Sequence, residues 1–218
     1  DTLPNPTDLA LLMDTTRGYG EGFTAMLVGR VASQRGILMP DRMYPIRIPP
    51  EVAGAAPLPF TLAITRQESS FDPRARSSAD ARGMMQFLPS TAQGVARRMG
   101  LSYSADQLWD ADYNMTLGSY HLGELTNRFG GSVLMTTVGY NAGPARPNQW
   151  VERCGDPRTS PEAAIDFIEC APFTETRNYM MRVMENLSVY KARLNGGSAP
   201  LTISADIAAG SGSGPRPY

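Results

Sequence analysis

The chain has 218 residues, of which 42% are apolar, 8% aromatic and 19% charged. A chain of this length and composition can bury a core without metals or dense cross-links, which excludes wholesale disorder. Its 20 basic and 21 acidic side chains leave a net charge of -1, so it lacks the basic field typical of nucleic-acid-binding proteins. No apolar run reaches the roughly 18 residues of a membrane span. We therefore expect no nucleic-acid partner and no membrane-spanning segment.

Residues 1–50 carry short helical patterns followed by a connector rich in proline. The patterns cover residues 9–13 and 22–33. The connector, residues 40–59, contains six prolines, which remove backbone donors and favour an extended chain. We place a domain boundary near Glu51. Because the chain begins at Asp1 rather than at Met, we expect that a segment has been removed, and one interpretation of residues 1–50 is the remnant of a larger upstream domain.

Residues 51–194 show helical periodicity, and no alternating strand pattern competes with it. Helices are predicted at residues 58–68, 91–99, 111–129, 133–140, 161–168 and 174–194. Glycine and proline mark the gaps between them. The pattern predicts an all-α domain, followed by a segment rich in Gly, Ser, Ala and Pro at residues 195–218. We interpret this segment mostly as a mobile tail, in which only residues 201–207 could pack.

Glu68 is the first candidate for chemistry. It shares one helical stripe with Phe60 and Ile64, at i, i+4 and i+8, so its carboxyl group is expected to face apolar surroundings. It also lies in the last turn of the predicted helix, where the helix dipole disfavours negative charge. Both effects would raise the pKa of Glu68 and suit a general acid. The plain alternative, which the stripe alone favours, is a fraying helix end with Glu68 in solvent.

The second candidate is an amide in an apolar run. Gln86 follows Gly83 and lies in the segment ARGMMQFLPSTA, residues 81–92. A buried amide must find partners, and Gly83 permits close approach of another backbone. The segment forms either a core loop with a locally satisfied Gln86 or a cleft wall that offers an amide to a polar ligand.

Two further patches place polar residues at helix ends. Tyr140 and Asn141 end a predicted helix ahead of a glycine, where they either cap and pack or present a hydroxyl and an amide to a carboxyl group or a sugar. Glu175 lies in the first turn of the last predicted helix, where capping is its default role. His121 and Trp109 receive no role, because single residues of these types on a helix are more often packed than catalytic.

The chain contains two cysteines, Cys154 and Cys170, and one histidine. A structural zinc site would need more such ligands, so we expect no metal and no cofactor. The cysteine count is compatible both with two buried thiols and with one disulfide.

Taken in chain order, these patches resemble the soluble lytic transglycosylases, whose catalytic domain has a goose-type lysozyme-like helical fold. The family patterns are E-S-x-F, then A-x-S with G-L-M-Q-I/L-M-P-x-T-A, A-x-Y-N-A-G, and I-P-Y/F-x-E-T-R-x-Y. This chain has ESSF at 68–71, ARS at 75–77 with GMMQFLPSTA at 83–92, VGYNAG at 138–143, and APFTETRNY at 171–179. The resemblance covers residues 51–194. Leu88 replaces a family Met that looks to the substrate, which leaves subsite preference open.

The resemblance implies an enzyme, a peptidoglycan lytic transglycosylase. It would cleave the β-1,4 bond between N-acetylmuramic acid and N-acetylglucosamine and close a 1,6-anhydromuramoyl end without consuming water. Glu68 would be the single general acid and base. The implied substrate-binding residues are Ser77, Gln86, Tyr140, Asn141 and Glu175.

Individual roles follow from the same resemblance. Tyr140 would orient Glu68 or the acetamido group through its hydroxyl. Gln86 and Asn141 would donate hydrogen bonds to sugar or acetamido oxygens. Glu175 would either help to place the muramoyl ring or cap its helix.

The implied partners are peptidoglycan glycan strands, and the implied location is the periplasm or another extracytoplasmic compartment of a bacterium. Disulfides persist there, so we predict a bridge between Cys154 and Cys170. An envelope protein or a missing upstream domain could dock on the N-terminal helices. Two alternatives stay open: a goose-type lysozyme, in which water attacks C1, and a non-catalytic peptidoglycan-binding module of an envelope assembly.

Overall fold

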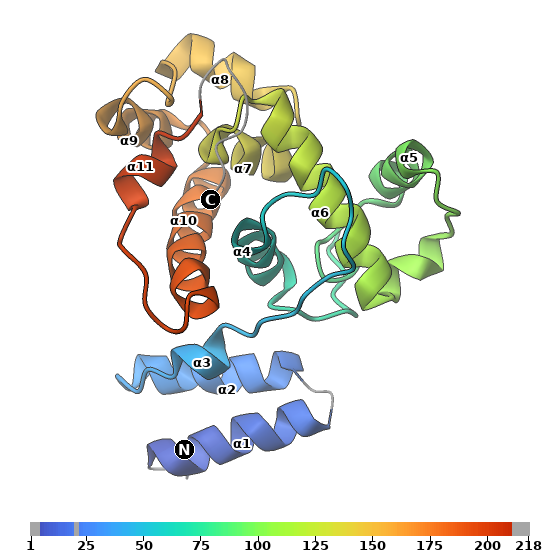
Figure 1. The fold of residues 1–218 in the computed structure, drawn as a ribbon, viewed down its shortest axis with the longest axis vertical. Coiled ribbons are helices and arrows are strands. Elements are labelled where there is room, and N and C mark those ends of the chain that lie inside the picture. The colour runs from blue at the N-terminus through green and yellow to red at the C-terminus, as the bar shows by residue number, and fades with distance from the viewer. Residues whose placement is uncertain (1–4, 20–21, 211–218) are drawn as a thin grey trace.

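The computed structural model describes residues 5–19 and 22–210. Within these residues the secondary structure is helical, and only isolated β-bridges occur in place of strands. The predicted all-α class is therefore confirmed. The N-terminal helices form a layer at one end of the molecule, at the bottom of Figure 1, and the remaining helices form a larger body above it.

The N-terminal layer consists of α1 (Pro6–Gly18), α2 (Gly22–Gln34) and α3 (Pro40–Met43). Asn5 caps α1, because its side chain accepts a hydrogen bond from the backbone N–H of Asp8 at 2.8 Å. Helices α1 and α2 approach closely at Gly29, where an added Cβ would lie only 2.9 Å from Met13 Cε. The layer therefore has a small core of its own.

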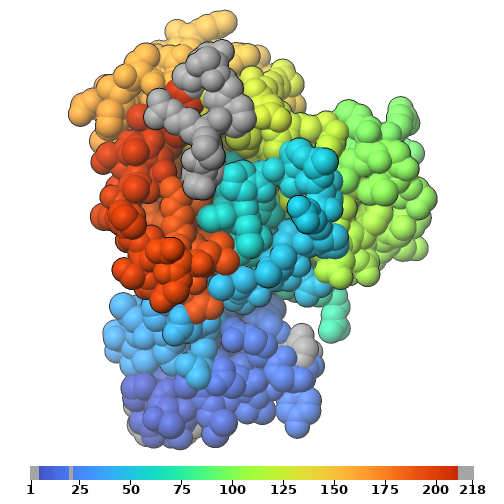
Figure 2. Space-filling view, viewed as in Figure 1, coloured from blue at the N-terminus to red at the C-terminus, as the bar shows by residue number. Residues whose placement is uncertain are grey.

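The chain that follows α3 attaches this layer to the body. The ring of Tyr44 packs edge-on against Tyr190, with 5.5 Å between the centroids, and lies 3.9 Å below the guanidinium carbon of Arg66. The Tyr190 hydroxyl donates to the Pro45 carbonyl, and Arg66 Nε donates to the Met43 carbonyl, each at 3.1 Å. Figure 2 shows the layer lying directly against the body. The connector is thus held in place by side chains of the body.

Helix α4 (Leu58–Ser69) lies at the centre of the body, and α10 (Thr174–Leu194) packs along it. Phe60 and Ile64 of α4 are fully buried, as the predicted stripe requires. Asn186 of α10 donates to the Ala63 carbonyl at 3.3 Å. These two helices therefore share a buried core.

Helix α6 (Ala111–Arg128) supports the segment that leads into α5 (Pro89–Met99), and a short 3-10 helix, η1 (Ala105–Trp109), precedes α6. Asn114 of α6 is fully buried and accepts a hydrogen bond from the Met85 backbone N–H at 2.8 Å. Its amide nitrogen donates to the carbonyls of Arg82 and Leu108, each at 2.9 Å. One buried side chain thus fixes the segment that contains Gln86.

The upper part of the body in Figure 1 contains α7 (Val133–Ala142), α8 (Arg146–Cys154) and α9 (Pro161–Cys170). A disulfide joins Cys154 to Cys170, with 5.7 Å between the Cα atoms. Trp150 and Phe167 pack with 6.3 Å between their ring centroids. The disulfide lies just before α10, so it fixes the chain that enters this helix.

The sequence pattern misses α8, although it predicts every longer helix of residues 51–194 to within a few residues. Helix α8 has nine residues, contains Pro147 near its start and follows Gly143-Pro144. Glycine and proline usually mark a loop, and the apolar periodicity of nine residues is too short to predict a helix against that signal.

Part of the expected tail is packed on the body. Helix α11 (Ile203–Ile207) lies against α9 and α10, and Asp206 is buried. Asp206 Oδ1 lies 2.6 Å from the Nζ of Lys191, the single lysine of the chain. Residues 211–218 lie outside the described part of the chain.

Candidate active site

Glu68 lies where α4 ends and the chain turns sharply. Ser70 closes the helix at a φ of 56°, and Phe71 follows at 64°. Such left-handed values are uncommon for residues other than glycine and cost conformational energy. The Ser69 hydroxyl donates to the Met84 carbonyl at 2.7 Å. This bond ties the turn to the segment of Gln86 and so fixes where the Glu68 side chain points.

All six residues predicted for catalysis or substrate binding line one pocket of about 390 Å³. They are Glu68, Ser77, Gln86, Tyr140, Asn141 and Glu175. Helices α4, α7 and α10 and the segment before α5 each contribute to this set. Leu88 and His121 line the same pocket. The fold therefore brings the separate sequence patches together around one carboxyl group.

The Glu68 carboxyl group is strongly desolvated. Burial raises its pKa from 4.5 to about 7, and the nearby charge of Glu175 acts in the same direction. A hydrogen bond from the Tyr179 hydroxyl to Oε1 lowers the pKa, but desolvation outweighs it. Near neutral pH the carboxyl group is thus divided between its protonated and ionised forms. It can donate a proton in one step and accept one in the next.

Tyr179 is a site residue that the sequence analysis did not single out. Its ring is buried in α10, and burial together with Glu68 raises its own pKa well above 10, so the hydroxyl keeps its proton. Tyr179 lies four positions after Glu175, on the same face of the helix. That spacing, at the end of the fourth motif, is the signal that could have found it.

The Tyr140 hydroxyl is directed elsewhere. It donates to the Met85 carbonyl at 2.8 Å, and the ring packs against Phe87 and His121. The structure thus assigns Tyr140 to the wall of the pocket and gives the hydrogen bond with Glu68 to Tyr179.

The two amide side chains of the pocket make opposite hydrogen bonds to the protein: Gln86 donates through its nitrogen, and Asn141 accepts through its oxygen. Gln86 has a φ of 51° and turns its amide nitrogen to the carbonyls of Ala75 and Gly83, each at 2.9 Å. Its donors are therefore occupied, contrary to the expectation that they bind sugar, and its amide oxygen is the end left for a ligand. Asn141 accepts from the Thr176 hydroxyl through Oδ1 at 2.7 Å, which leaves its amide donors.

Ser77 and Glu175 border the same pocket. The Ser77 hydroxyl oxygen accepts from the Ala81 backbone N–H at 3.0 Å, so its proton can be donated to a ligand. Glu175 is exposed in the first turn of α10, where the helix dipole stabilises a carboxylate. Among the residues that the structure describes, Glu175 forms no hydrogen bond or ion pair. The helix position of Glu175 therefore favours its ionised form, and its side chain is available to bind a ligand at the rim of the pocket.

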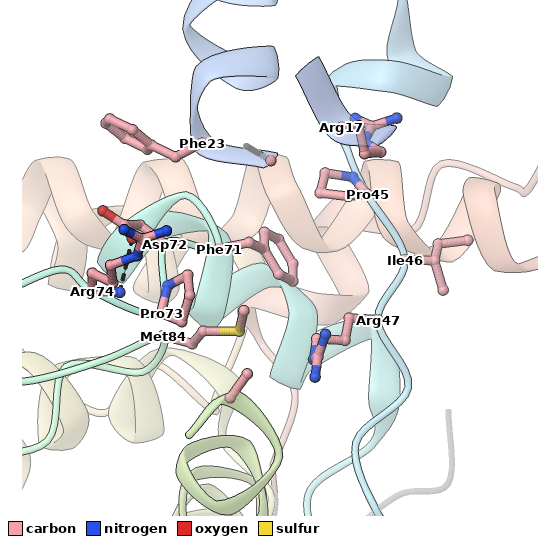
Figure 3. Close-up of a pocket in the computed structure, with 12 residues that line it drawn as sticks. Arg17, Phe23, Pro45, Ile46, Arg47, Phe71, Asp72, Pro73, Arg74 and Met84 are labelled. Carbon is pink, nitrogen blue, oxygen red and sulfur yellow. Dashed lines mark hydrogen bonds between the residues drawn. The ribbon is translucent and has the colours of Figure 1, made fainter. Parts of the chain in front are cut away.

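A second pocket, of about 480 Å³, lies between the N-terminal layer and the loop that follows Glu68 (Figure 3). Arg17, Pro45 and Arg47 line it on one side, and Phe71 and Met84 on the other. It shares no lining residue with the pocket that contains Glu68. The side chains of Phe71 and Met84 thus line this second pocket. Their backbones belong to the turn after Glu68 and to the segment of Gln86, which border the pocket that contains Glu68.

No group of three or more His, Cys, Asp or Glu side chains in residues 5–19 and 22–210 could hold a metal ion. In the same residues, no helix is long and apolar enough to cross a membrane.

Comparison with known protein families matches residues 51–162 to the Transglycosylase SLT domain. The match covers more than half of the 218 residues and includes Glu68, Gln86 and Tyr140. The chain belongs to this SLT family. The match ends within α9, so Glu175 and Tyr179 join the SLT site from a helix beyond it.

The relatives of this SLT chain are much longer than it is. It is 41% identical over 127 residues to a Haemophilus influenzae protein assigned as a soluble lytic murein transglycosylase, a match that covers 57% of this chain and 21% of that protein. Lytic transglycosylase Slt of Pseudomonas aeruginosa, solved as an inactive glutamate-to-glutamine mutant, has a TM-score of 0.73 and 29% identity. That match covers 93% of this chain and 32% of the solved one. This chain thus spans about a fifth of the curated relative.

The 70-kDa soluble lytic transglycosylase of Escherichia coli has the same fold, with a TM-score of 0.77 at 24% identity. The match covers 97% of this chain and 33% of the E. coli one. Because so little of the chain is left unmatched, the N-terminal helices also have counterparts in the longer protein. The lysozyme-like, all-α fold class expected from the sequence is confirmed.

Proposed function

We propose that this SLT chain is a peptidoglycan lytic transglycosylase. It cleaves the β-1,4 bond between N-acetylmuramic acid and N-acetylglucosamine and leaves a 1,6-anhydromuramoyl end. The observation that supports this most is a single desolvated carboxyl group, Glu68, with a pKa of about 7 in a pocket lined by hydrogen-bonding side chains. The names of the relatives support the reaction class, and the P. aeruginosa relative is inactive as a glutamate-to-glutamine mutant.

The proposed reaction needs only one protein carboxyl group. In the first step, protonated Glu68 gives its proton to the glycosidic oxygen as the bond to C1 breaks, and the substrate's own 2-acetamido group stabilises the positive C1. In the second step, ionised Glu68 accepts the proton of the C6 hydroxyl while that oxygen bonds to C1. Glu68 ends protonated, and no water is consumed. The Tyr179 hydroxyl stabilises the ionised form between the steps.

The remaining pocket residues bind and orient the sugar in this proposal. Asn141 donates through its amide, Ser77 donates through its hydroxyl, and Gln86 accepts through its amide oxygen. Leu88, 42% exposed, offers an apolar contact in place of the family's Met. Glu175 stays at the rim, where it helps to place the muramoyl ring.

Peptidoglycan glycan strands are the proposed partner, and the site of action is outside the cytoplasmic membrane, in the periplasm or an equivalent compartment. The disulfide between Cys154 and Cys170 is compatible with that oxidising location. An envelope protein or a missing upstream domain that docks on the N-terminal layer is part of the same proposal.

Digestion of purified sacculi tests the reaction. We expect the wild-type chain to release muropeptides that are one water lighter at the muramoyl end, as read by mass spectrometry. The Glu68→Gln variant should release them at least about 100-fold more slowly. Reducing muramoyl ends would instead assign the chain to the goose-type lysozymes. If the wild type binds sacculi but releases no product, the chain is instead a non-catalytic peptidoglycan-binding module.

Tyr179→Phe is expected to lower kcat by roughly 10- to 100-fold, because a hydrogen bond to a charged group is lost. The same change removes the cause that lowers the pKa of Glu68. That pKa should rise, so the pH-rate limb set by ionisation of Glu68 should move to higher pH. Tyr113→Phe is the matched control, since the Tyr113 hydroxyl binds the Ser102 carbonyl at 2.6 Å outside the pocket. A Tyr179→Phe profile that coincides with the wild type would contradict this role.

A further inference from the structure

His121 is the single histidine of the chain, and it lines the pocket that contains Glu68. It projects from α6, and its ring lies 5.9 Å from the ring of Phe87 and 5.9 Å from that of Tyr140, measured between centroids. The side chain is 17% exposed. The reaction proposed above uses none of its atoms, so the polar edge of the ring has no assigned purpose.

The hydrogen bonds behind the ring determine which nitrogen carries the proton. His121 Nδ1 lies 3.3 Å from Oε2 of Glu124, and Arg98 donates to both carboxylate oxygens of Glu124 at 2.6 Å. Burial acts to raise the pKa of Glu124, but the bonds from Arg98 and His121 lower it overall. An ionised carboxylate can only accept hydrogen bonds, so Nδ1 must be the nitrogen that carries hydrogen.

The same surroundings keep the ring neutral. Burial lowers the pKa of His121, although Glu124 acts in the opposite direction. A neutral imidazole with hydrogen on Nδ1 has a lone pair on Nε2. Within residues 5–19 and 22–210, the hydrogen bond of Nδ1 to Glu124 is the one that the ring makes. The pocket is therefore lined by an imidazole whose Nε2 can accept a hydrogen bond, and the contact of Nδ1 with Glu124 fixes this tautomer.

We propose that Nε2 of His121 is a specificity-determining acceptor that binds a hydroxyl or an amide N–H of the sugar held beside Glu68. This inference rests on the proposed function, since it concerns a subsite of the same pocket. N-acetylated sugars supply both kinds of donor. In the proposed complex Asn141 donates to the sugar and Gln86 accepts from it, so His121 adds an acceptor from a third element, the α6 wall.

Nitrogen NMR on the histidine tests this directly, because one histidine gives one pair of ring signals. The protein is the Glu68→Gln variant labelled with 15N-histidine, which binds without turnover. The probe is a soluble tetrasaccharide of alternating N-acetylglucosamine and N-acetylmuramic acid, and calorimetry fixes its saturation. We expect a protonated Nδ1, an unprotonated Nε2, and a shift of the Nε2 signal at saturation.

Each other outcome separates the two proposals. A protonated Nε2, or an Nε2 signal that stays in place when the tetrasaccharide is bound, overturns the role of His121 and leaves the proposed function intact. If the tetrasaccharide does not bind and the wild type releases no product from sacculi, the proposed function fails, and the subsite fails with it.

A pair of variants gives a second measurement. His121→Phe keeps a ring between Phe87 and Tyr140 but has no acceptor, whereas His121→Gln places a polar atom near the position of Nε2. The Phe variant should weaken tetrasaccharide binding and raise KM by about fivefold, the effect of one neutral hydrogen bond, with kcat changed less than KM. The Gln variant should recover part of the loss. Equal affinity for the Phe variant and the wild type would overturn the proposal.

Discussion

Replacing Glu68 by Gln is expected to lower kcat on peptidoglycan by about 10²- to 10⁴-fold, the usual contribution of a positioned proton donor and acceptor. The amide keeps the size of the side chain but cannot give up or take a proton in either step. Initial rates of muropeptide release from sacculi measure the loss. A variant that retains more than about a tenth of the wild-type rate would show that another group carries the proton transfers.

The same substitution should stabilise the fold, but only at higher pH. In the unfolded chain Glu68 titrates near 4.5, whereas in the folded chain its pKa is about 7. Between these values the unfolded state releases a proton that the folded state still holds. The free energy of unfolding of the wild type therefore falls, relative to the Gln variant, as pH rises through this window.

The difference should nearly vanish near pH 4 and reach about 3–4 kcal/mol well above pH 7, because each unit of pKa shift is worth about 1.4 kcal/mol. Urea unfolding of both proteins at about pH 4 and about pH 8 gives the comparison. A stability difference that is the same at both pH values would mean that the pKa of Glu68 is not raised.

Gly83→Ala should strongly destabilise the fold beside the site, with a loss of about 3–4 kcal/mol in the free energy of unfolding. Gly83 has a φ of 76°, and an added Cβ would lie 2.2 Å from the Leu108 carbonyl oxygen and 2.3 Å from Asn114 Nδ2. These atoms belong to the buried contact that fixes the segment of Gln86. Activity should therefore fall together with stability.

Gly100→Ala is the matched control, because Gly100 has a φ of 69° and no atom within 4 Å of an added Cβ. It has the same left-handed strain without the clash, so we expect a loss of about 1 kcal/mol. Urea unfolding of both variants isolates the steric part. Equal losses in the free energy of unfolding would mean that the chain around Gly83 shifts to relieve the clash with the added Cβ.

The sequence predicts the helices of residues 51–194 because hydrophobic periodicity is a local property. The stripe of Glu68 with Phe60 and Ile64 indicates apolar surroundings but by itself favours a helix end in solvent, so the catalytic role of Glu68 depends on the resemblance carried by the four motifs. The residues of the four motifs then meet in one pocket because α4 and α10 share a core. Periodicity is therefore sufficient for the helices, whereas the set of site residues depends on the family resemblance.

The directions of the polar side chains could not be predicted in this way. Tyr179 binds Glu68 across 111 positions, and Tyr140 binds Met85 across 55. The choice between the two tyrosines depends on how the helices cross, and neither motif contains that information. The sequence assigns His121 no role, because a single histidine on a helix is more often packed than catalytic, and its place in the pocket follows from the packing of α6.

Lys191 has a practical consequence for labelling. It supplies the single side-chain amine of the chain, is 18% exposed, and lies against Asp206 beneath α11. Amine-directed dyes, cross-linkers and sensor surfaces therefore have one side-chain target, and reaction there must first separate it from its carboxylate. Coupling through that amine would disturb the contact that holds α11, so attachment chemistry for this protein belongs at exposed carboxyl groups instead.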